Sequence, residues 1–148
     1  MSRFTEILLV SPMIDGKTWI IQRNFGYDVG EEGSEEVINV PVGFATDFAS
    51  VPRLFWVFIP RWGRYGNAAV IHDYCYWDQR YDRKRSDEIF LEGMTVLKVK
   101  GWQKLFIFYA VRWFGWYAWR KNQRQKSKNP KAKFQDIEKI NKMSIPKL

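Results

Sequence analysis

The chain has one histidine, His72, and it lies beside a carboxylate in the run His72-Asp73-Tyr74-Cys75-Tyr76. A second aspartate, Asp87, follows fifteen residues later, near the start of the next expected helix. If these two helices pack antiparallel across a short turn, Asp87 can reach one ring nitrogen of His72. A carboxylate bonded to one nitrogen fixes the tautomer and leaves the other nitrogen basic, as a general base that deprotonates water requires. His72 and Asp87 are therefore candidate catalytic residues.

Asp73 offers a second carboxylate to the same site. Successive residues of a helix are about 100° apart around its axis, so Asp73 can hold a hard cation beside the water that His72 would deprotonate. One histidine and one cysteine exclude every zinc site built from several His or Cys ligands. Oxygen-ligated metals, or no metal, remain.

A second polar group lies in the segment 40–52, where Thr46, Asp47 and Ser50 are embedded among apolar residues and followed by Pro52. Buried polar groups need hydrogen-bond partners. Asp47 and Ser50 either cap a turn by bonding its backbone or support the histidine site. We take as a candidate supporting network Thr46, Asp47, Ser50 and Tyr76.

Strands are expected before these residues. The runs 6–10, 18–23 and 36–40 are rich in β-branched and aromatic residues between turn signals. Asp15-Gly16 is a tight-turn dipeptide, which predicts a hairpin from the first two runs. The stretch 26–33 is acidic and glycine-rich, and we expect it to be a loop.

Three helices are expected after Pro60, over residues 67–79, 83–99 and 102–120. The third is apolar almost all round, yet residues 105–119 are only fifteen and include Arg112. A bilayer-spanning helix needs about 20 mostly apolar residues, so we expect no span. The helix is either buried, in the domain or in an oligomer interface, or it lies at a membrane surface with its tryptophans at headgroup depth.

The 148 residues suffice for one domain, and the formal charge of +8 is uneven along the chain. Residues 121–148 hold nine Lys and Arg against two Asp and Glu, whereas residues 1–120 are close to neutral. We expect an α+β domain over 1–120 and a flexible or partner-ordered tail over 121–148. Its candidate contacts to an anionic partner are Lys121, Arg124, Lys126, Lys128, Lys131 and Lys133. No apolar stretch follows Met1, so no conventional secretion signal is visible.

The segments 40–53 and 68–77, with Pro60, Gly63 and Tyr65 between them, resemble the domain-of-unknown-function family 1353, which occurs in bacteriophages, prophages and bacteria. The resemblance covers about residues 35–120. It implies a phage or prophage origin, hence a location in the phage particle or in the cytoplasm of the bacterial host. It implies no activity.

A more distant resemblance concerns chemistry. Residues 72–76 are similar to the His-Asp-x-Cys-Tyr helix of secreted phospholipase A2, and residues 86–90 to the helix that follows it there. This resemblance implies that His72 activates water, that Asp73 binds calcium and that Asp87 orients the histidine. The paired cysteines of that family and its glycine-rich calcium loop are missing here, so Asp47 or carbonyls of residues 63–66 would have to complete a calcium site.

Three functional hypotheses follow. The first is a water-activating His/Asp ester hydrolase of phospholipase A2 type, acting at an anionic membrane surface. The second is a non-catalytic subunit of a phage particle, in which His72, Asp73 and Asp87 form a buried network and aromatic surface docks neighbouring subunits. The third, nucleic-acid binding through the tail, is less favoured because residues 1–120 are almost neutral and carry no recognised base-stacking motif.

Overall fold

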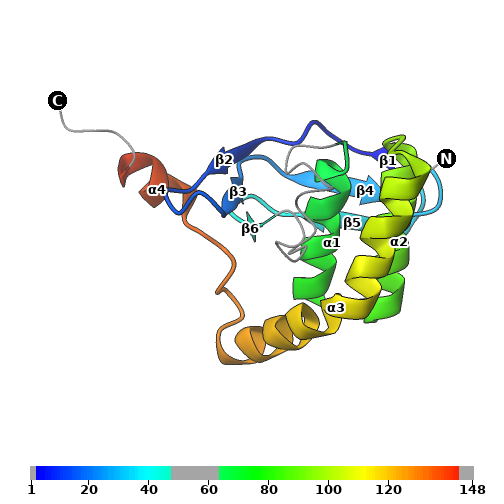
Figure 1. The fold of residues 1–148 in the computed structure, drawn as a ribbon. Coiled ribbons are helices and arrows are strands. Elements are labelled where there is room, and N and C mark those ends of the chain that lie inside the picture. The colour runs from blue at the N-terminus through cyan, green and yellow to red at the C-terminus, as the bar shows by residue number, and fades with distance from the viewer. Residues whose placement is uncertain (1–2, 48–63, 144–148) are drawn as a thin grey trace.

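The computed structural model describes residues 3–47 and 64–143, and the fold is α+β as the sequence predicts. Two small antiparallel sheets come first, and helices follow (Figure 1). The first sheet has the order β1-β4-β5, with β1 Arg3–Phe4, β4 Phe25–Asp28 and β5 Val37–Val40. The second has the order β2-β3-β6, with β2 Val10–Pro12, β3 Trp19–Ile21 and β6 Ala45–Thr46. The helices are α1 Gly66–Asp78, α2 Arg83–Val96, α3 Gly101–Lys128 and α4 Ile137–Met143.

A hairpin around Asp15-Gly16 is confirmed, but its first strand is Val10–Pro12, so the prediction of a strand over 6–10 is wrong except at Val10. Strands β2 and β3 pair antiparallel, from Val10 opposite Ile21 to Pro12 opposite Trp19. In the turn, one oxygen of the Asp15 carboxylate accepts the backbone N–H groups of Lys17 and Thr18, at 2.9 and 2.8 Å. Asp15 suits this turn because its carboxylate is close to the backbone and can accept several hydrogen bonds at once.

The prediction of a loop over 26–33 is wrong for its first part, because β4 is the central strand of the first sheet and is buried throughout. Gly26 serves close packing here. A Cβ at this position would lie 2.7 Å from the Thr5 hydroxyl and 2.9 Å from the Asn39 side chain. A glycine in a strand marks such a close approach as readily as it marks a loop.

Helix α1 lies between the sheets and the other helices. Of its thirteen residues nine are buried, and one apolar cluster joins it to the strands while a second joins it to α2 and α3. Asp82 begins α2 by accepting the Arg85 N–H at 2.7 Å, as an N-cap does. The second helix ends at Val96 rather than near residue 99. Side chains on α1 are thus held in fixed positions inside the molecule.

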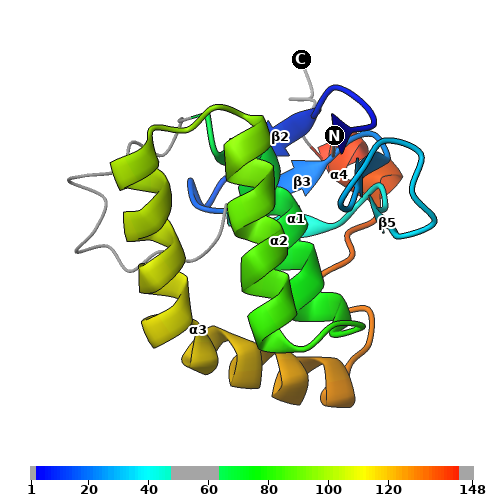
Figure 2. The same cartoon turned by 90° about the vertical axis from the view of Figure 1, so that its right-hand side faces the viewer.

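Helix α3 extends to Lys128, so our prediction that it ends near residue 120 is wrong. It bends sharply about midway, and its second half passes below the ends of α1 and α2 (Figure 2). At the bend the Arg83 guanidinium donates to the carbonyls of Val111 and Arg112, at 3.2 and 3.0 Å. A side chain that takes carbonyls from the helical ladder is a recognised cause of a kink. At the far end, the Lys126 ammonium donates to the Asp78 carbonyl at 2.5 Å.

The segment after α3 returns to the strands. Ala45 donates its N–H to the Lys133 carbonyl, and Gln135 donates its N–H to the Gly43 carbonyl, both at 2.8 Å. Residues 133–135 therefore run beside 43–45, although the sequence placed them in a flexible or partner-ordered tail. In the described residues no helix has the length and apolarity to cross a membrane, in agreement with our prediction for residues 105–119.

Substitution of Gly43 tests this contact. Gly43 has φ +90°, and a Cβ there would lie 2.5 Å from the Gln135 carbonyl oxygen. Gly16, with φ +65° and nothing within 4 Å of its Cβ position, is the matched control. We expect Gly16→Ala to lower the free energy of unfolding by about 1 kcal/mol through backbone strain alone, and Gly43→Ala to lower it clearly more, in urea titrations. Equal losses would contradict the packing of residues 133–135 on Gly43.

Candidate active site

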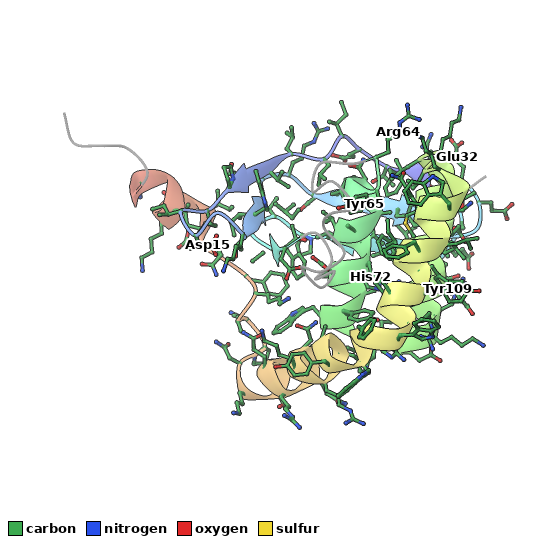
Figure 3. The ribbon with its side chains drawn as sticks, in the orientation of Figure 1. Asp15, Glu32, Arg64, Tyr65, His72 and Tyr109 are labelled. Carbon is green, nitrogen blue, oxygen red and sulfur yellow. The ribbon has the colours of Figure 1, made fainter. Side chains whose placement is uncertain are left out.

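The predicted pair of His72 and Asp87 is present in the structure. His72 lies midway along α1 (Figure 3), and Asp87 lies on the neighbouring helix α2. The Nε2 atom of His72 is 2.8 Å from Asp87 Oδ1, and both side chains are almost completely buried. The two helices are joined by a short turn, which brings these positions opposite one another.

The Asp87 carboxylate is the centre of a larger network. Its Oδ1 atom also accepts the Tyr76 hydroxyl at 2.7 Å, and its Oδ2 atom accepts the Arg112 guanidinium at 2.6 Å. Arg83 lies 3.5 Å from the same Oδ2. Burial alone would raise the pKa of Asp87, but the hydrogen bonds from His72, Tyr76 and Arg112 lower it below its usual value. Asp87 is thus ionised at neutral pH.

The ionised Asp87 determines the tautomer of His72. An ionised carboxylate only accepts hydrogen bonds, so the Nε2 atom must carry the proton that it donates. In the neutral ring the Nδ1 atom is then an acceptor. This atom is buried and has no hydrogen-bond partner among the described residues. The ring is held by Phe90, stacked at 4.5 Å between centroids, and by Tyr76 at 4.2 Å.

Sequence reasoning missed Arg83 and Arg112 as members of this network. Arg83 precedes Asp87 by four residues and therefore shares its helix face. Arg112 is a charge within the aromatic stretch of α3, where we read it only as an interruption of an apolar helix. A buried carboxylate needs a cation, and this rule would have pointed to Arg112.

A cavity of about 90 Å³ adjoins the histidine. Its lining includes Asp47, His72, Asp73 and Tyr76. Helix α3 and the segment after it also line the cavity, and their polar residues there are Lys121, Asn122, Gln125 and Lys133. The bend of α3 therefore encloses the face of α1 that carries the candidate residues.

Asp73 binds two members of the predicted supporting network. Its Oδ2 atom accepts the Thr46 hydroxyl at 2.5 Å and the Asp47 N–H at 3.2 Å. Ser50, a third predicted member, lies outside the described residues. Tyr76 belongs instead to the Asp87 network. Burial is the main cause that raises the pKa of Tyr76, and the charge of Asp87 adds to it, so its hydroxyl stays a donor.

Calcium would need six to eight oxygen ligands around Asp73. In residues 3–47 and 64–143 no group of three or more His, Cys, Asp or Glu could hold a metal ion, and Asp73 Oδ2 already accepts two hydrogen bonds. The described residues do not fit a calcium site. The role of Asp73 as a calcium ligand stays a prediction.

The close approach of α1 and α3 depends on Gly115. A Cβ at this position would lie 2.5 Å from the Tyr76 hydroxyl and 3.3 Å from its ring. Any side chain at Gly115 would therefore displace the hydroxyl that bonds Asp87.

Of the predicted anion-binding residues, Lys121 and Lys133 line the cavity, and the Lys126 ammonium is bonded to the end of α1. Exposed positions are occupied by Arg124, Lys128 and Lys131. Large aromatic side chains are exposed along α3 as well, and they include Trp102, Tyr109, Trp113, Trp116 and Tyr117.

The acid dependence of stability tests the state of Asp87. Because the folded protein holds the pKa of Asp87 below its ordinary value of 3.8, this residue stabilises the fold above that value, and the contribution is lost as the pH falls through 3.8 towards the folded pKa. We expect Asp87→Asn to lower the free energy of unfolding at pH 7 by about 3 kcal/mol, because Arg112 loses its buried partner.

The variant should also lose less stability than the parent protein on acidification. Asp15, whose pKa is lowered to about 2 in the hairpin turn, titrates in both proteins and cancels in the difference. The measurement is chemical denaturation at a series of pH values. If the free energy of unfolding changes with pH by the same amount in the two proteins, Asp87 has the same pKa in the folded and unfolded states, which would contradict the prediction.

Comparison with known proteins places the chain in a family. The family model described as "Protein of unknown function (DUF1353)" matches residues 19–111, which include Thr46, His72 and Asp87. An uncharacterized protein, y4jT, of Sinorhizobium fredii (strain NBRC 101917 / NGR234) is 40% identical over 81 residues, which are 51% of this chain and 23% of that protein. The chain thus matches only about a quarter of that relative's length. No solved structure matches it. Since the family model covers more than half of the sequence, the chain belongs to the family of unknown function DUF1353.

Proposed function

We propose that this protein is an ester hydrolase in which His72 activates water. The observation that carries the proposal is the unpartnered Nδ1 atom of a buried histidine whose Nε2 is fixed by an ionised aspartate. A buried acceptor without a donor costs about 1–3 kcal/mol, and the cavity that His72 lines has room for a water. Asp47, Asp73 and Asn122 line the same cavity and supply the further polar partners that a buried water needs.

The proposed reaction uses these groups in two proton transfers. His72 Nδ1 takes a proton from the water as its oxygen attacks the carbonyl carbon of the ester, and a tetrahedral intermediate forms. Asp87 stabilises the imidazolium that results, since its carboxylate lies 2.8 Å from Nε2. The intermediate then expels the alcohol oxygen, which receives the proton from Nδ1, and the acid product leaves. The ring ends in its starting tautomer. The resemblance of residues 72–76 and 86–90 to secreted phospholipase A2 supports the same roles.

The substrate that fits the surroundings is an amphiphilic ester at a membrane surface. A hollow of about 530 Å³, almost entirely apolar, is lined by Phe106, Tyr109, Ala110, Trp113 and Phe114. It shares Ala110 and Phe114 with the cavity that His72 lines. An apolar chain in this hollow would bring an attached ester group to the histidine.

The charge of α3 supports an anionic surface as the partner. The helix contains seven Lys and Arg and no Asp or Glu, and Trp113 and Tyr117 are 70% and 66% exposed. Aromatic rings with basic residues are typical of helices that lie in a membrane interface, where each Lys or Arg contributes about 1 kcal/mol. A phage-particle subunit docked on the same aromatic face is the alternative.

Substitution of the histidine tests the chemistry. His72→Gln keeps an N–H that can donate to Asp87 and removes the basic nitrogen. We expect about a 10²–10⁴-fold loss of kcat/KM for ester hydrolysis, measured on a chromogenic acyl ester and on phospholipid vesicles, with thermal unfolding nearly unchanged.

The control for this test is Cys75→Ala, next to Tyr76 but outside the network. The Cys75 thiol is buried, and burial raises its pKa to about 12, so it is no nucleophile. This variant should hydrolyse esters at the parent rate. If the parent protein has no hydrolase activity, or if His72→Gln keeps it, the proposal is wrong and a non-catalytic role for the network stands.

Vesicle binding tests the partner. Trp113→Ser should weaken binding to vesicles that contain phosphatidylglycerol, because an exposed ring is lost from the interface, and added salt should weaken binding further. Ile14→Ser, at a fully exposed apolar position in the hairpin turn, is the matched control and should bind like the parent. Cosedimentation measures both. Absence of vesicle binding together with self-association lost in Trp113→Ser would favour docking between subunits instead.

A further inference from the structure

Asn122 occupies an unusual position in α3. The only buried residues of this helix are Ile107, Ala110, Val111 and Asn122. The neighbours of Asn122 in the second half, such as Lys121, Gln123 and Arg124, are exposed. An inward-facing helix position ordinarily takes an apolar residue, and a buried amide is unfavourable unless it is hydrogen-bonded.

In the described part of the chain the Asn122 carboxamide forms no hydrogen bond, and although the residue is only 7% exposed, its polar atoms are not sealed in the way that His72 Nδ1 is. It lines the cavity that His72 also lines. Two polar groups without hydrogen-bond partners in the described residues, one on α1 and one on α3, therefore line the same small cavity. One, His72 Nδ1, is an acceptor, and the other carries two N–H donors.

We propose that the Asn122 carboxamide binds the carbonyl oxygen of the ester and stabilises the negative charge that this oxygen gains when water attacks. This inference rests on the proposed hydrolase activity. It adds a residue that binds the substrate's carbonyl oxygen while His72 acts as the base. An acyl-transfer site needs such a donor, because the oxygen becomes an oxyanion in the intermediate. His72 Nδ1 cannot serve, since it accepts, and the Asp47 N–H is already bonded to Asp73.

The surroundings favour this role. Lys121 lies next to Asn122 on α3, and Lys133 lies in the segment after that helix, whereas Asp73 lies next to His72 on α1. Basic residues thus come from the part of the chain that supplies the proposed oxyanion donor, and an acidic residue comes from the helix that supplies the base. The second half of the bent α3, which contains Asn122, passes below the ends of α1 and α2 (Figure 2).

The test compares Asn122→Leu with Gln123→Leu, a substitution of similar size at the exposed neighbour. For Asn122→Leu we expect a loss of kcat of about 100-fold or more with little change in KM, and an unchanged shape of the pH–rate profile because His72 remains the base. Gln123→Leu should keep the parent kcat.

A binding measurement separates this inference from the hydrolase itself. A hexylphosphonate monoester imitates the charged tetrahedral intermediate, and calorimetry should show binding to the parent and to His72→Gln but at least tenfold weaker binding to Asn122→Leu. Thermal unfolding of Asn122→Leu should stay close to the parent value, because the amide has no hydrogen bond to lose among the described residues.

Two results would overturn the proposal. If His72→Gln abolishes hydrolysis while Asn122→Leu keeps the parent kcat and phosphonate affinity, Asn122 does not bind the substrate and the hydrolase stands without it. If Asn122→Leu is strongly destabilised, its amide holds the fold through a partner of its own.

Discussion

The charge of Asp87 is the constraint on which the remainder of the molecule depends. A carboxylate with no solvent exposure is stable only when it is surrounded by donors and a cation. Tyr76 and His72 reach it from α1, Arg83 from its own helix and Arg112 from α3. Three helices must therefore keep their relative positions for one charge to stay paired.

The same pairing creates the features of the candidate site. Arg83 bonds carbonyls of α3 at the bend, so the group that supports Asp87 also shapes the helix that encloses the cavity. Gly115 permits the close contact of that bend with Tyr76. Because Asp87 takes the proton-bearing nitrogen of His72, the other nitrogen is left as an acceptor. The contacts of Asp87 thus hold the helices together and also leave His72 Nδ1 as a hydrogen-bond acceptor.

Local patterns in the sequence predicted much of the fold. Asp15-Gly16 predicted the hairpin, and the spacing of His72 and Asp87 predicted their contact once an antiparallel helix pair was assumed. Both depend on residues close in the chain. Gly26 was misread because a close approach to Thr5 and Asn39 is a tertiary fact, and a single glycine does not distinguish it from a loop.

The remainder depended on contacts between distant segments. The partnership of Arg112 with Asp87, the bend of α3 and the return of residues 133–135 to Gly43 all join residues far apart in sequence. Lys-rich composition after residue 120 suggested a tail, yet α3 continues there because its inner face meets the end of α1 through Lys126 and Trp119. Asn122 was not predicted, since nothing in a polar stretch marks one amide as buried.

The state of the His72 ring decides whether it can act as a base, and nitrogen-15 NMR of histidine-labelled, tag-free protein observes this ring without overlap because the chain contains one histidine. We expect a protonated Nε2 and an unprotonated, pyridine-like Nδ1, with the Nε2 proton shifted downfield by the Asp87 carboxylate. A ring protonated at Nδ1 and bare at Nε2 would contradict it, because His72 would then have no bond to donate to Asp87 and no basic nitrogen to offer to water.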